Sequence, residues 1–213
     1  MVLYDLKTLP TGAQTSKVVA EVRSLGGREC LWVALPPDIR ENGIPDVDYI
    51  DTENFVVLPE IFSTGVLEVD IFTTLAPDAT SEDRGFSGLA YHIDQSLENF
   101  ESVYIRGTNG LKENPPHPRN ARGIQYFAFP SAKFDYLRTN FPGVYEAPAN
   151  LGLNEWISLR LEVDDSGVKA YVNEDLALVV EKSLCKANTG RVGLRVDIGT
   201  EAYFSNLRIS KFN

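Results

Sequence analysis

The chain has 213 residues, of which 43% are hydrophobic, and 30 acidic against 20 basic residues give it a formal net charge of -10. This length and apolar content predict a single domain over residues 1–213. The negative field repels phosphate backbones and anionic lipid headgroups, which argues against nucleic acid and membranes as partners. No feature of the sequence determines the oligomeric state.

Cys30 and Cys185 are the only cysteines, and they lie far apart in the sequence. No Cys/His spacing typical of a zinc site occurs, and no nucleotide-binding fingerprint occurs, so no metal and no cofactor is predicted. The N-terminus lacks the basic and apolar stretches of a secretion signal. We therefore expect free thiols and a cytoplasmic location.

Alternation of apolar and polar residues predicts strands along most of the chain. In residues 65–72, for example, Leu67, Val69 and Ile71 alternate with Glu68 and Asp70. The predicted strands occupy residues 29–35, 65–72, 88–93, 102–106, 156–163, 168–173, 176–180, 191–198 and 202–209.

Many short strands without a break in composition predict an all-β fold, a two-sheet antiparallel jelly-roll sandwich. One short helix is expected at residues 131–140, where Phe134, Leu137 and Phe141 have helical spacing.

The segment 104–146 places long hydrogen-bonding side chains among aromatic residues, and Pro130 and Pro142 restrict its backbone. Polar groups on a rigid connecting segment are typical of binding surfaces. The alternatives are a segment that hydrogen-bonds to itself and, for Arg106, an ion pair with a sheet neighbour such as Glu68 or Glu162. The predicted substrate-binding residues are Tyr104, Arg106, Gln125, Tyr126, Arg138, Tyr145 and Glu146.

The predicted catalytic candidates are Glu68, Asp70 and His92. Glu68 and Asp70 are two residues apart on a strand, so they share a face and their Cα atoms lie about 6.5–7 Å apart. The distances between the two catalytic carboxyl groups of glycosidases fall on either side of this value. The alternative is a solvated strand face. His92 could move a proton near neutral pH, although a structural histidine is the more ordinary outcome. We expect Glu68, Asp70, His92, Tyr104, Arg106 and Gln125 to lie on one concave face.

A calcium site is the alternative to a solvated loop for the acidic segment 46–53. Asp46, Asp48, Asp51 and Glu53 offer oxygen ligands, but their spacing matches no defined calcium loop. The solvated loop is favoured, and no metal is predicted.

The chain resembles the concanavalin A-like lectin/glucanase superfamily and, more narrowly, bacterial laminin-G-like and keto-disaccharide-hydrolase-like domains. The matching stretches lie between residues 54 and 209, and they include 62–71, 86–91, 103–106, 125–126, 137–138, 142–146, 168–173 and 199–207. The resemblance implies two curved antiparallel sheets, a ligand surface on or beside the concave one, and sugars or glycosides as ligands.

The laminarinase-type glucanases of that superfamily carry a third carboxylate after the first two, whereas this chain has Phe72 and Thr73 at those positions. The sequence therefore predicts recognition of a carbohydrate or glycoside, with acid/base chemistry on a glycosidic bond as a further step. The alternatives are a binding module without catalysis, a small-molecule cyclase or isomerase that uses the same pocket, and an interaction domain that uses a sheet edge.

Overall fold

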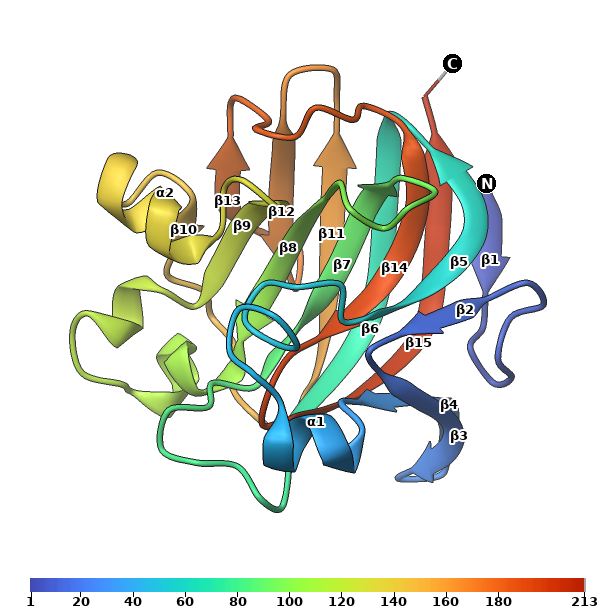
Figure 1. Cartoon of the computed structure of the whole chain (residues 1–213), viewed down its shortest axis with the longest axis horizontal. Coiled ribbons are helices and arrows are strands. Elements are labelled where there is room, and N and C mark those ends of the chain that lie inside the picture. Colours follow the sequence, from blue (N-terminus) through green and yellow to red (C-terminus); the bar gives the residue numbers. More distant parts are fainter. Residues whose placement is uncertain (213) are drawn as a thin grey trace.

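The computed structural model describes residues 1–212, which form two packed antiparallel sheets with short helices and loops around them (Figure 1). The eight-stranded sheet, called the back sheet, consists of β1 (Val2–Tyr4), β3 (Val19–Leu25), β4 (Arg28–Ala34), β6 (Gly65–Leu75), β11 (Trp156–Val163), β12 (Val168–Val172), β13 (Asp175–Val180) and β15 (Thr200–Lys211). The seven-stranded sheet, called the front sheet, consists of β2 (Gln14–Ser16), β5 (Phe55–Phe62), β7 (Phe86–Ile93), β8 (Phe100–Arg106), β9 (Ile124–Phe129), β10 (Glu146–Ala147) and β14 (Gly190–Val196).

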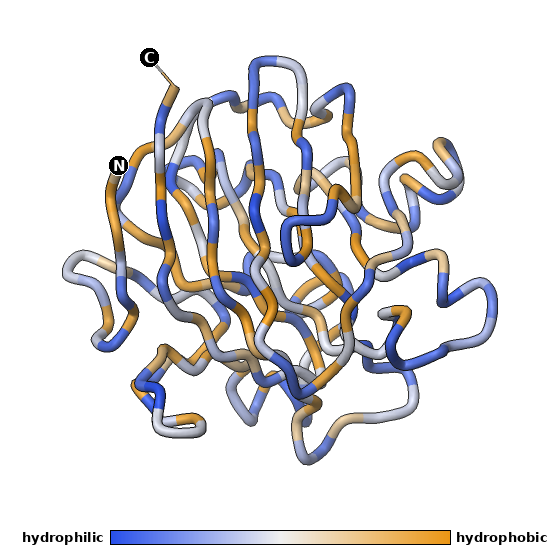
Figure 2. The backbone as a smooth tube through the Cα atoms, turned by 180° about the vertical axis from the view of Figure 1, so that it is seen from behind, coloured by the Kyte–Doolittle hydropathy of each residue, from blue (hydrophilic) through white to orange (hydrophobic). Residues whose placement is uncertain are grey.

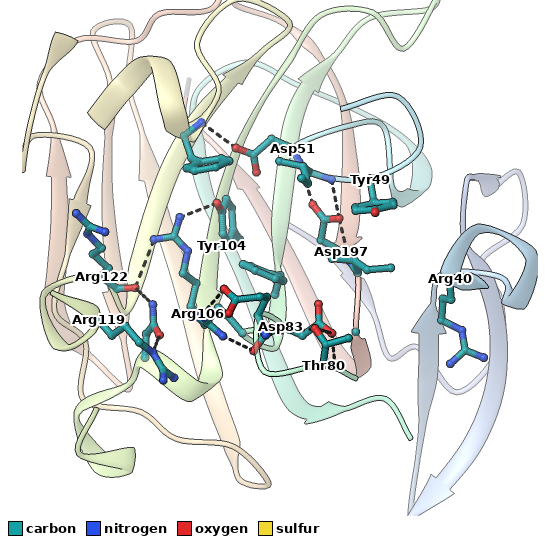
Figure 3. Close-up of a pocket in the computed structure, with 18 of the residues that line it drawn as sticks. Arg40, Tyr49, Asp51, Thr80, Asp83, Tyr104, Arg106, Arg119, Arg122 and Asp197 are labelled. Carbon is teal, nitrogen blue, oxygen red and sulfur yellow. Dashed lines mark hydrogen bonds and ion pairs between the residues drawn. The ribbon is translucent and has the colours of Figure 1, made fainter. Parts of the chain in front are cut away.

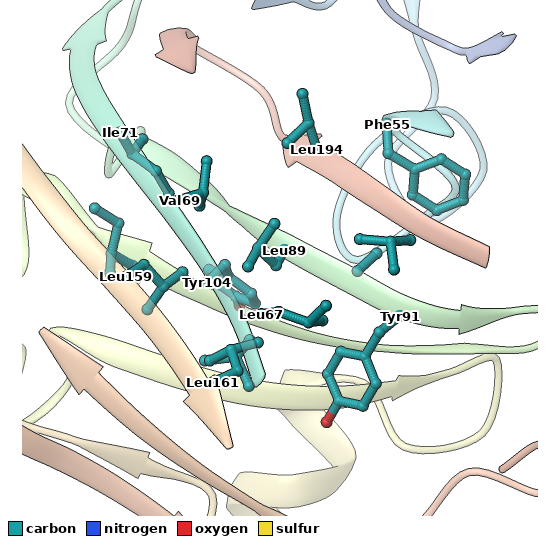
Figure 4. Close-up of a cluster of buried hydrophobic side chains, with 14 of the residues drawn as sticks. Phe55, Leu67, Val69, Ile71, Leu89, Tyr91, Tyr104, Leu159, Leu161 and Leu194 are labelled. Carbon is teal, nitrogen blue, oxygen red and sulfur yellow. The ribbon is translucent and has the colours of Figure 1, made fainter. Parts of the chain in front are cut away.

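The core lies between the two sheets. In β6 the residues Leu67, Val69 and Ile71 are fully buried, and they belong to the same apolar cluster as Leu89 and Leu194 of the front sheet (Figure 4). Burying each such side chain contributes about 1.5–3 kcal/mol. The alternation along the back-sheet strands, visible in Figure 2, therefore fixes which face of that sheet points inward.

The front sheet is buried on both faces. Its register pairs Val103 with Leu89, and these residues face the core. Tyr104 pairs with Gly88 and Gln125, so this row faces away from the back sheet. Since every residue of β8 is nevertheless buried, other segments must cover the outer face of the front sheet.

The covering segments lie over a second layer of aromatic side chains. On the outer face of the front sheet, the ring centroid of Phe100 lies 5.0 Å from that of Phe55 and 5.6 Å from that of Phe127. The ring centroid of Phe127 lies 5.8 Å from that of Tyr104. Over and around this face lie the loop 43–54, α2 (Phe134–Asn140) and three 3-10 turns, η1 (Gly107–Asn109), η2 (Leu111–Glu113) and η3 (Arg119–Ala121), while α1 (Pro37–Asn42) lies at one end of the sandwich (Figure 1).

The predicted all-β jelly-roll sandwich is confirmed. The helix expected at residues 131–140 is α2, which begins at Phe134. The strands β5 and β9 are not predicted from the sequence pattern. Both of their faces are largely buried, which removes the alternation of apolar and polar residues. Within the described residues, no helix has the length and apolar character needed to cross a membrane.

Candidate functional site

A pocket of about 560 Å³ opens on the outer face of the front sheet (Figure 3). Strands β7 and β8 form its floor with Phe86, Tyr104 and Arg106. Loops and α2 build the walls around them. The wall residues that bear on the site are Tyr49, Asp51, Asp83, Arg84, Asn109, Arg119, Arg122, Phe134, Arg138, Asp197 and Gly199.

Tyr104 and Arg106 lie two residues apart on β8, so both side chains project from the outer face of the sheet. Gly88 lies opposite Tyr104, and a Cβ atom at Gly88 would be 2.6 Å from the Cα of Tyr104. Only glycine allows this approach. Phe86 meets Tyr104 edge to face at 6.0 Å between ring centroids, and the two rings give the pocket an apolar floor.

Arg106 is the most connected polar group of the floor. Its Nη2 donates to the hydroxyl of Tyr104 at 3.0 Å and to Oε1 of Gln125. Its Nη1 donates to Oε2 of Glu146 at 3.1 Å. The side chain is only 4% exposed, and burial opposes its charge, but Tyr104 and Glu146 raise its pKa above the ordinary arginine value. The strand therefore holds a permanent cation at the base of the pocket.

Glu146 is shared by three arginines. Besides Arg106, Nε of Arg122 lies 3.1 Å from its Oε1, and Nη2 of Arg138 donates to its Oε2 at 2.8 Å. Burial raises the pKa of Glu146, but the hydrogen bonds and charges of Arg138 and Arg106 outweigh this effect and hold the pKa below its usual range. Glu146 is thus an ionised anchor that joins β8, β10 and α2.

A second buried ion cluster supports the opposite wall. Arg195 is fully buried and donates to Oδ2 of Asp197 at 2.7 Å and to Oδ1 of Asp51 at 3.3 Å. Asp197 also accepts the backbone N–H groups of Ile50, Asp51 and Ile198. Burial raises the pKa of Asp51 despite its contact with Arg195. These bonds fix the loop 43–54 against the end of β14.

Asp83 lies on the wall between the two clusters. Its Oδ2 accepts hydrogen bonds from the backbone N–H of Thr80 at 2.6 Å and from the Thr80 hydroxyl at 3.1 Å. Gly199 has φ +66° and leaves no room for a side chain beside Asp83. Among residues 1–212, Oδ1 of Asp83 has no hydrogen-bond partner, so this oxygen can accept a bond from a ligand.

The structure brings together five of the seven predicted binding residues: Tyr104, Arg106, Gln125, Arg138 and Glu146. Tyr126 instead faces the core on β9, where its hydroxyl donates to Oε2 of Glu101 at 2.6 Å. Tyr145 stacks on Tyr126, with ring centroids 5.4 Å apart. These two tyrosines support the site from the inner side of the sheet, because Tyr126 and its neighbour Gln125 on β9 point to opposite faces.

The expectation that Glu68 and Asp70 share a face with Arg106 is wrong. Both acids belong to β6 of the back sheet and point away from the core. Glu68 accepts from Arg208 at 3.1 Å, while Asp70 accepts from Arg28 and, at 2.9 Å, from Asn206. Alternation predicts that two residues share a face of one strand, but it cannot tell which sheet that strand enters.

His92 also lies outside the pocket. It occupies a bulge in β7, where φ is +54° and the register with β14 shifts. Its Nδ1 lies 2.8 Å from Oε1 of Glu101, and its Nε2 lies 2.6 Å from the carbonyl oxygen of Ser63. Because the bulge turns the ring into this buried network, His92 does not join Arg106 on the outer face.

The acidic loop 46–53 does not converge on one point. Glu53 pairs with Lys17 at 2.8 Å, Asp46 with Lys133 at 3.4 Å, and Asp51 with Arg195. Within residues 1–212, no group of three or more His, Cys, Asp or Glu side chains is arranged to hold a metal ion. Cys30 is a buried free thiol and Cys185 is a half-buried one.

Several pocket residues were not predicted as binding residues, and those outside the segment 104–146 come from parts of the chain that are distant in the sequence. The loops 78–84 and 197–199 converge on the site only through the pairing of β7 with β14. The segment 115–122 was a weak signal, since its Arg119 and Arg122 stand among prolines in an otherwise acidic chain. The unforeseen residues are Tyr49, Asp51, Asp83, Arg84, Asn109, Arg119, Arg122, Phe134 and Asp197.

No protein-family model matches this chain, and no curated protein matches its sequence. Three solved structures share its fold at a TM-score of 0.55. The carbohydrate-binding module CBM66 of Bacillus subtilis is 14% identical, and the match covers 91% of this chain and 94% of that one. A Bacillus subtilis protein of unknown function with a galectin-like fold is 12% identical, and the match covers 97% of this chain and 93% of that one. The Bacillus licheniformis beta-glucanase is 11% identical, and the match covers 99% of this chain and 98% of that one. These matches confirm the two-sheet jelly-roll fold that the resemblance implies.

Proposed function

We propose that this protein recognises a carbohydrate in the pocket on the outer face of the front sheet. The observation that carries the proposal is the floor of that pocket, where the half-buried ring of Phe86 lies beside the ring of Tyr104, with the arginines of the wall around them. A sugar presents an apolar ring face and a rim of hydroxyl groups. Aromatic rings cover the first, and planar multiple donors bind the second.

The size and the polar lining of the pocket support the same reading. A volume of about 560 Å³ lies within the range of small-molecule sites, which is roughly 300–1,000 Å³. Asp83 adds a free acceptor oxygen to the donors of the arginines. Their supporting loops are tied down by Asp197 and Glu146, so a ligand meets side chains that are already in place.

The comparisons support this proposal only through the fold. The names of two of the structural neighbours describe a carbohydrate-binding module and a beta-glucanase, and both cover nearly the whole chain. One fold carries many functions, so the choice of ligand depends on the residues of the pocket.

Calorimetric titration with neutral methyl glycosides and disaccharides tests the proposal. We expect saturable binding that weakens about tenfold when Tyr49, a half-buried ring on the pocket wall, is changed to leucine. The matched control is Tyr171→Leu, which alters a half-buried ring on the back sheet. Equal losses in both variants, or no binding by the wild type, would contradict the proposal.

A second candidate function is acid/base chemistry on the bound glycoside. The observation that favours it is the free Oδ1 of Asp83 within the pocket. Glu68 and Asp70 lie on the back sheet and cannot reach the pocket. The test is release of the leaving group from a panel of aryl glycosides. Asp83→Asn should abolish turnover and retain binding, whereas Glu68→Gln should leave both unchanged. Turnover that survives Asp83→Asn would remove this candidate.

A further inference from the structure

The pocket is electrically polarised, although the chain as a whole carries a net charge of -10. Six of the twelve arginines of the sequence line it, and no lysine among the described residues does. Figure 3 shows Arg106, Arg119 and Arg122 at one end, with Asp51 and Asp197 toward the other. Arg40 also lies toward that other end, where it pairs with Asp78 at 2.6 Å. The sugar-binding proposal alone does not require this separation of charge.

At the basic end, the positive charges outnumber the negative ones. Arg106, Arg122 and Arg138 share the single carboxylate of Glu146. Arg119 donates only to neutral groups, namely Asn109 and both oxygens of Thr108. Three arginines that surround one carboxylate, with a fourth beside them that has no acid, leave a local excess of positive charge.

Arg84 adds to this excess from the neighbouring loop. Its ion pair is with Glu82, at 3.3 Å, and the side chain of Glu82 is 85% exposed, so the pair lies at the wet rim of the pocket. Burial lowers the pKa of Arg84, and the charges of Arg119 and Arg106 lower it further, although Glu82 and Asp83 oppose this shift. Like charges that oppose each other in a half-enclosed space are relieved by an anion.

Donor groups also remain available at this end. Arg122 meets Glu146 through Nε, and its two terminal nitrogens make no hydrogen bond with any residue of 1–212. Nη1 of Arg138 and Nη1 of Arg119 are equally without partners in the described chain. Arg122 is a lining residue of the pocket and its side chain is 33% exposed, so its terminal nitrogens are accessible at the rim.

We propose that the basic end of the pocket binds an anionic group on the sugar, a carboxylate or a sulfate, so that the preferred ligand is an acidic saccharide. The fork of Arg122 would hold two oxygens of this group side by side, as arginine forks hold carboxylates and sulfate-like anions. Asp83, on the intervening wall, would accept bonds from the sugar hydroxyls. This inference rests on the proposed function and specifies its ligand class.

The test compares matched sugars that differ only in charge. Calorimetric titration would use methyl glucoside, methyl glucuronide and methyl glucoside 6-sulfate, together with the galactose series. We expect the acidic members to bind at least tenfold more tightly than the neutral ones, and this preference to fall as sodium chloride is raised. The carboxylate and the sulfate arms distinguish the two sources of the anionic group.

Arg122→Gln should remove most of that preference, so that acidic and neutral sugars bind with affinities within about threefold of each other. It should fold normally, since Arg106 and Arg138 still hold Glu146. The control is Arg28→Gln on the back sheet, whose side chain has a similar exposure of 32% and an ion pair with Asp70. A wild type that binds neutral and acidic sugars equally would overturn this inference and spare the proposed function. A wild type that binds no sugar of either kind would overturn both.

Discussion

Two surfaces of this protein carry the same kinds of residues and differ in how their charges are matched. The outer face of the back sheet has a row of aromatic side chains across three strands, in which Phe72 lies between Trp156 and Tyr203. The pocket on the front sheet has a floor of aromatic side chains as well. Both surfaces combine these rings with arginines and acids, so composition alone does not distinguish a site from a sheet surface.

On the back sheet the polar groups satisfy one another. Arg208 pairs with Glu68 and Arg28 pairs with Asp70, one cation to each acid. The guanidinium of Arg28 also covers the ring of Trp156 at 4.0 Å, and Arg160 covers Tyr171 at 3.8 Å. One face of each of these two rings is thus covered by a side chain of the protein itself.

In the pocket the matching is incomplete. Glu146 serves three arginines, Arg119 has no acid, and Asp83 keeps one free oxygen. Loops from three parts of the chain keep these groups half-buried, where water competes less well for them. The difference shows that unmatched polar groups within a covered concavity, and not the presence of acids and rings, mark the functional surface.

The largest effect on stability is expected from Glu146→Gln. This change leaves Arg106 charged and almost fully buried without its acid, so the free energy of unfolding should fall by about 3–5 kcal/mol. The matched change on the back sheet, Glu68→Gln, should cost about 1 kcal/mol or less, because that pair is solvated. Urea denaturation measures both values. Equal losses would remove the distinction between the two surfaces.

The dependence of stability on pH gives a smaller, related effect. The pKa of Glu146 is lowered in the folded state, so the unfolded chain binds more protons and the stabilisation is present above the unfolded pKa of about 4.3. It is lost as the pH falls through the folded pKa. The difference in unfolding free energy between wild type and Glu146→Gln should therefore be constant above about pH 5 and shrink below about pH 4.

This subtraction also cancels the opposite contribution of Asp51, whose pKa burial raises in both proteins. Urea denaturation between pH 3 and pH 7 supplies the comparison. A difference that stays constant down to pH 3 would show that Glu146 is not the ionised anchor of the arginines.

The smallest effect is expected from Tyr104→Phe. It removes the hydroxyl that accepts a bond from Arg106 and should lower the free energy of unfolding by about 1–2 kcal/mol. Tyr171→Phe on the back sheet removes the bond that its hydroxyl donates to Glu162, and the half-exposed position should limit the loss to about 0.5 kcal/mol. The reverse order, measured by urea denaturation, would contradict the assignment of the buried network to the pocket.

Much of the fold follows from the sequence, because a half-buried strand leaves an alternating pattern. The segment 65–72 has this pattern, and β6 lies there with Leu67 and Val69 in the core. The strand β9 lacks it, since covering segments bury its outer face as well. The jelly roll is therefore predictable, while the doubly buried strands are not.

The candidate site is predictable only within one stretch of chain. Residues 104–146 supplied Arg106, Gln125, Arg138 and Glu146, which are brought together by β8, β9, β10 and α2. Asp83 lies on the loop 78–84, which comes to lie beside the pocket only when the sheets form. Glu68 was misplaced for the same reason, since the choice of sheet depends on long-range pairing that no local pattern encodes.

The most direct test of the account is a crystal structure of the protein with a bound methyl glucuronide. We predict electron density for the sugar ring over Tyr104 and Phe86, with the carboxylate at the fork of Arg122 and no sugar on the back sheet. Density on the aromatic row of Trp156, Phe72 and Tyr203, with the pocket empty, would contradict the central claim and move the binding surface to the other sheet.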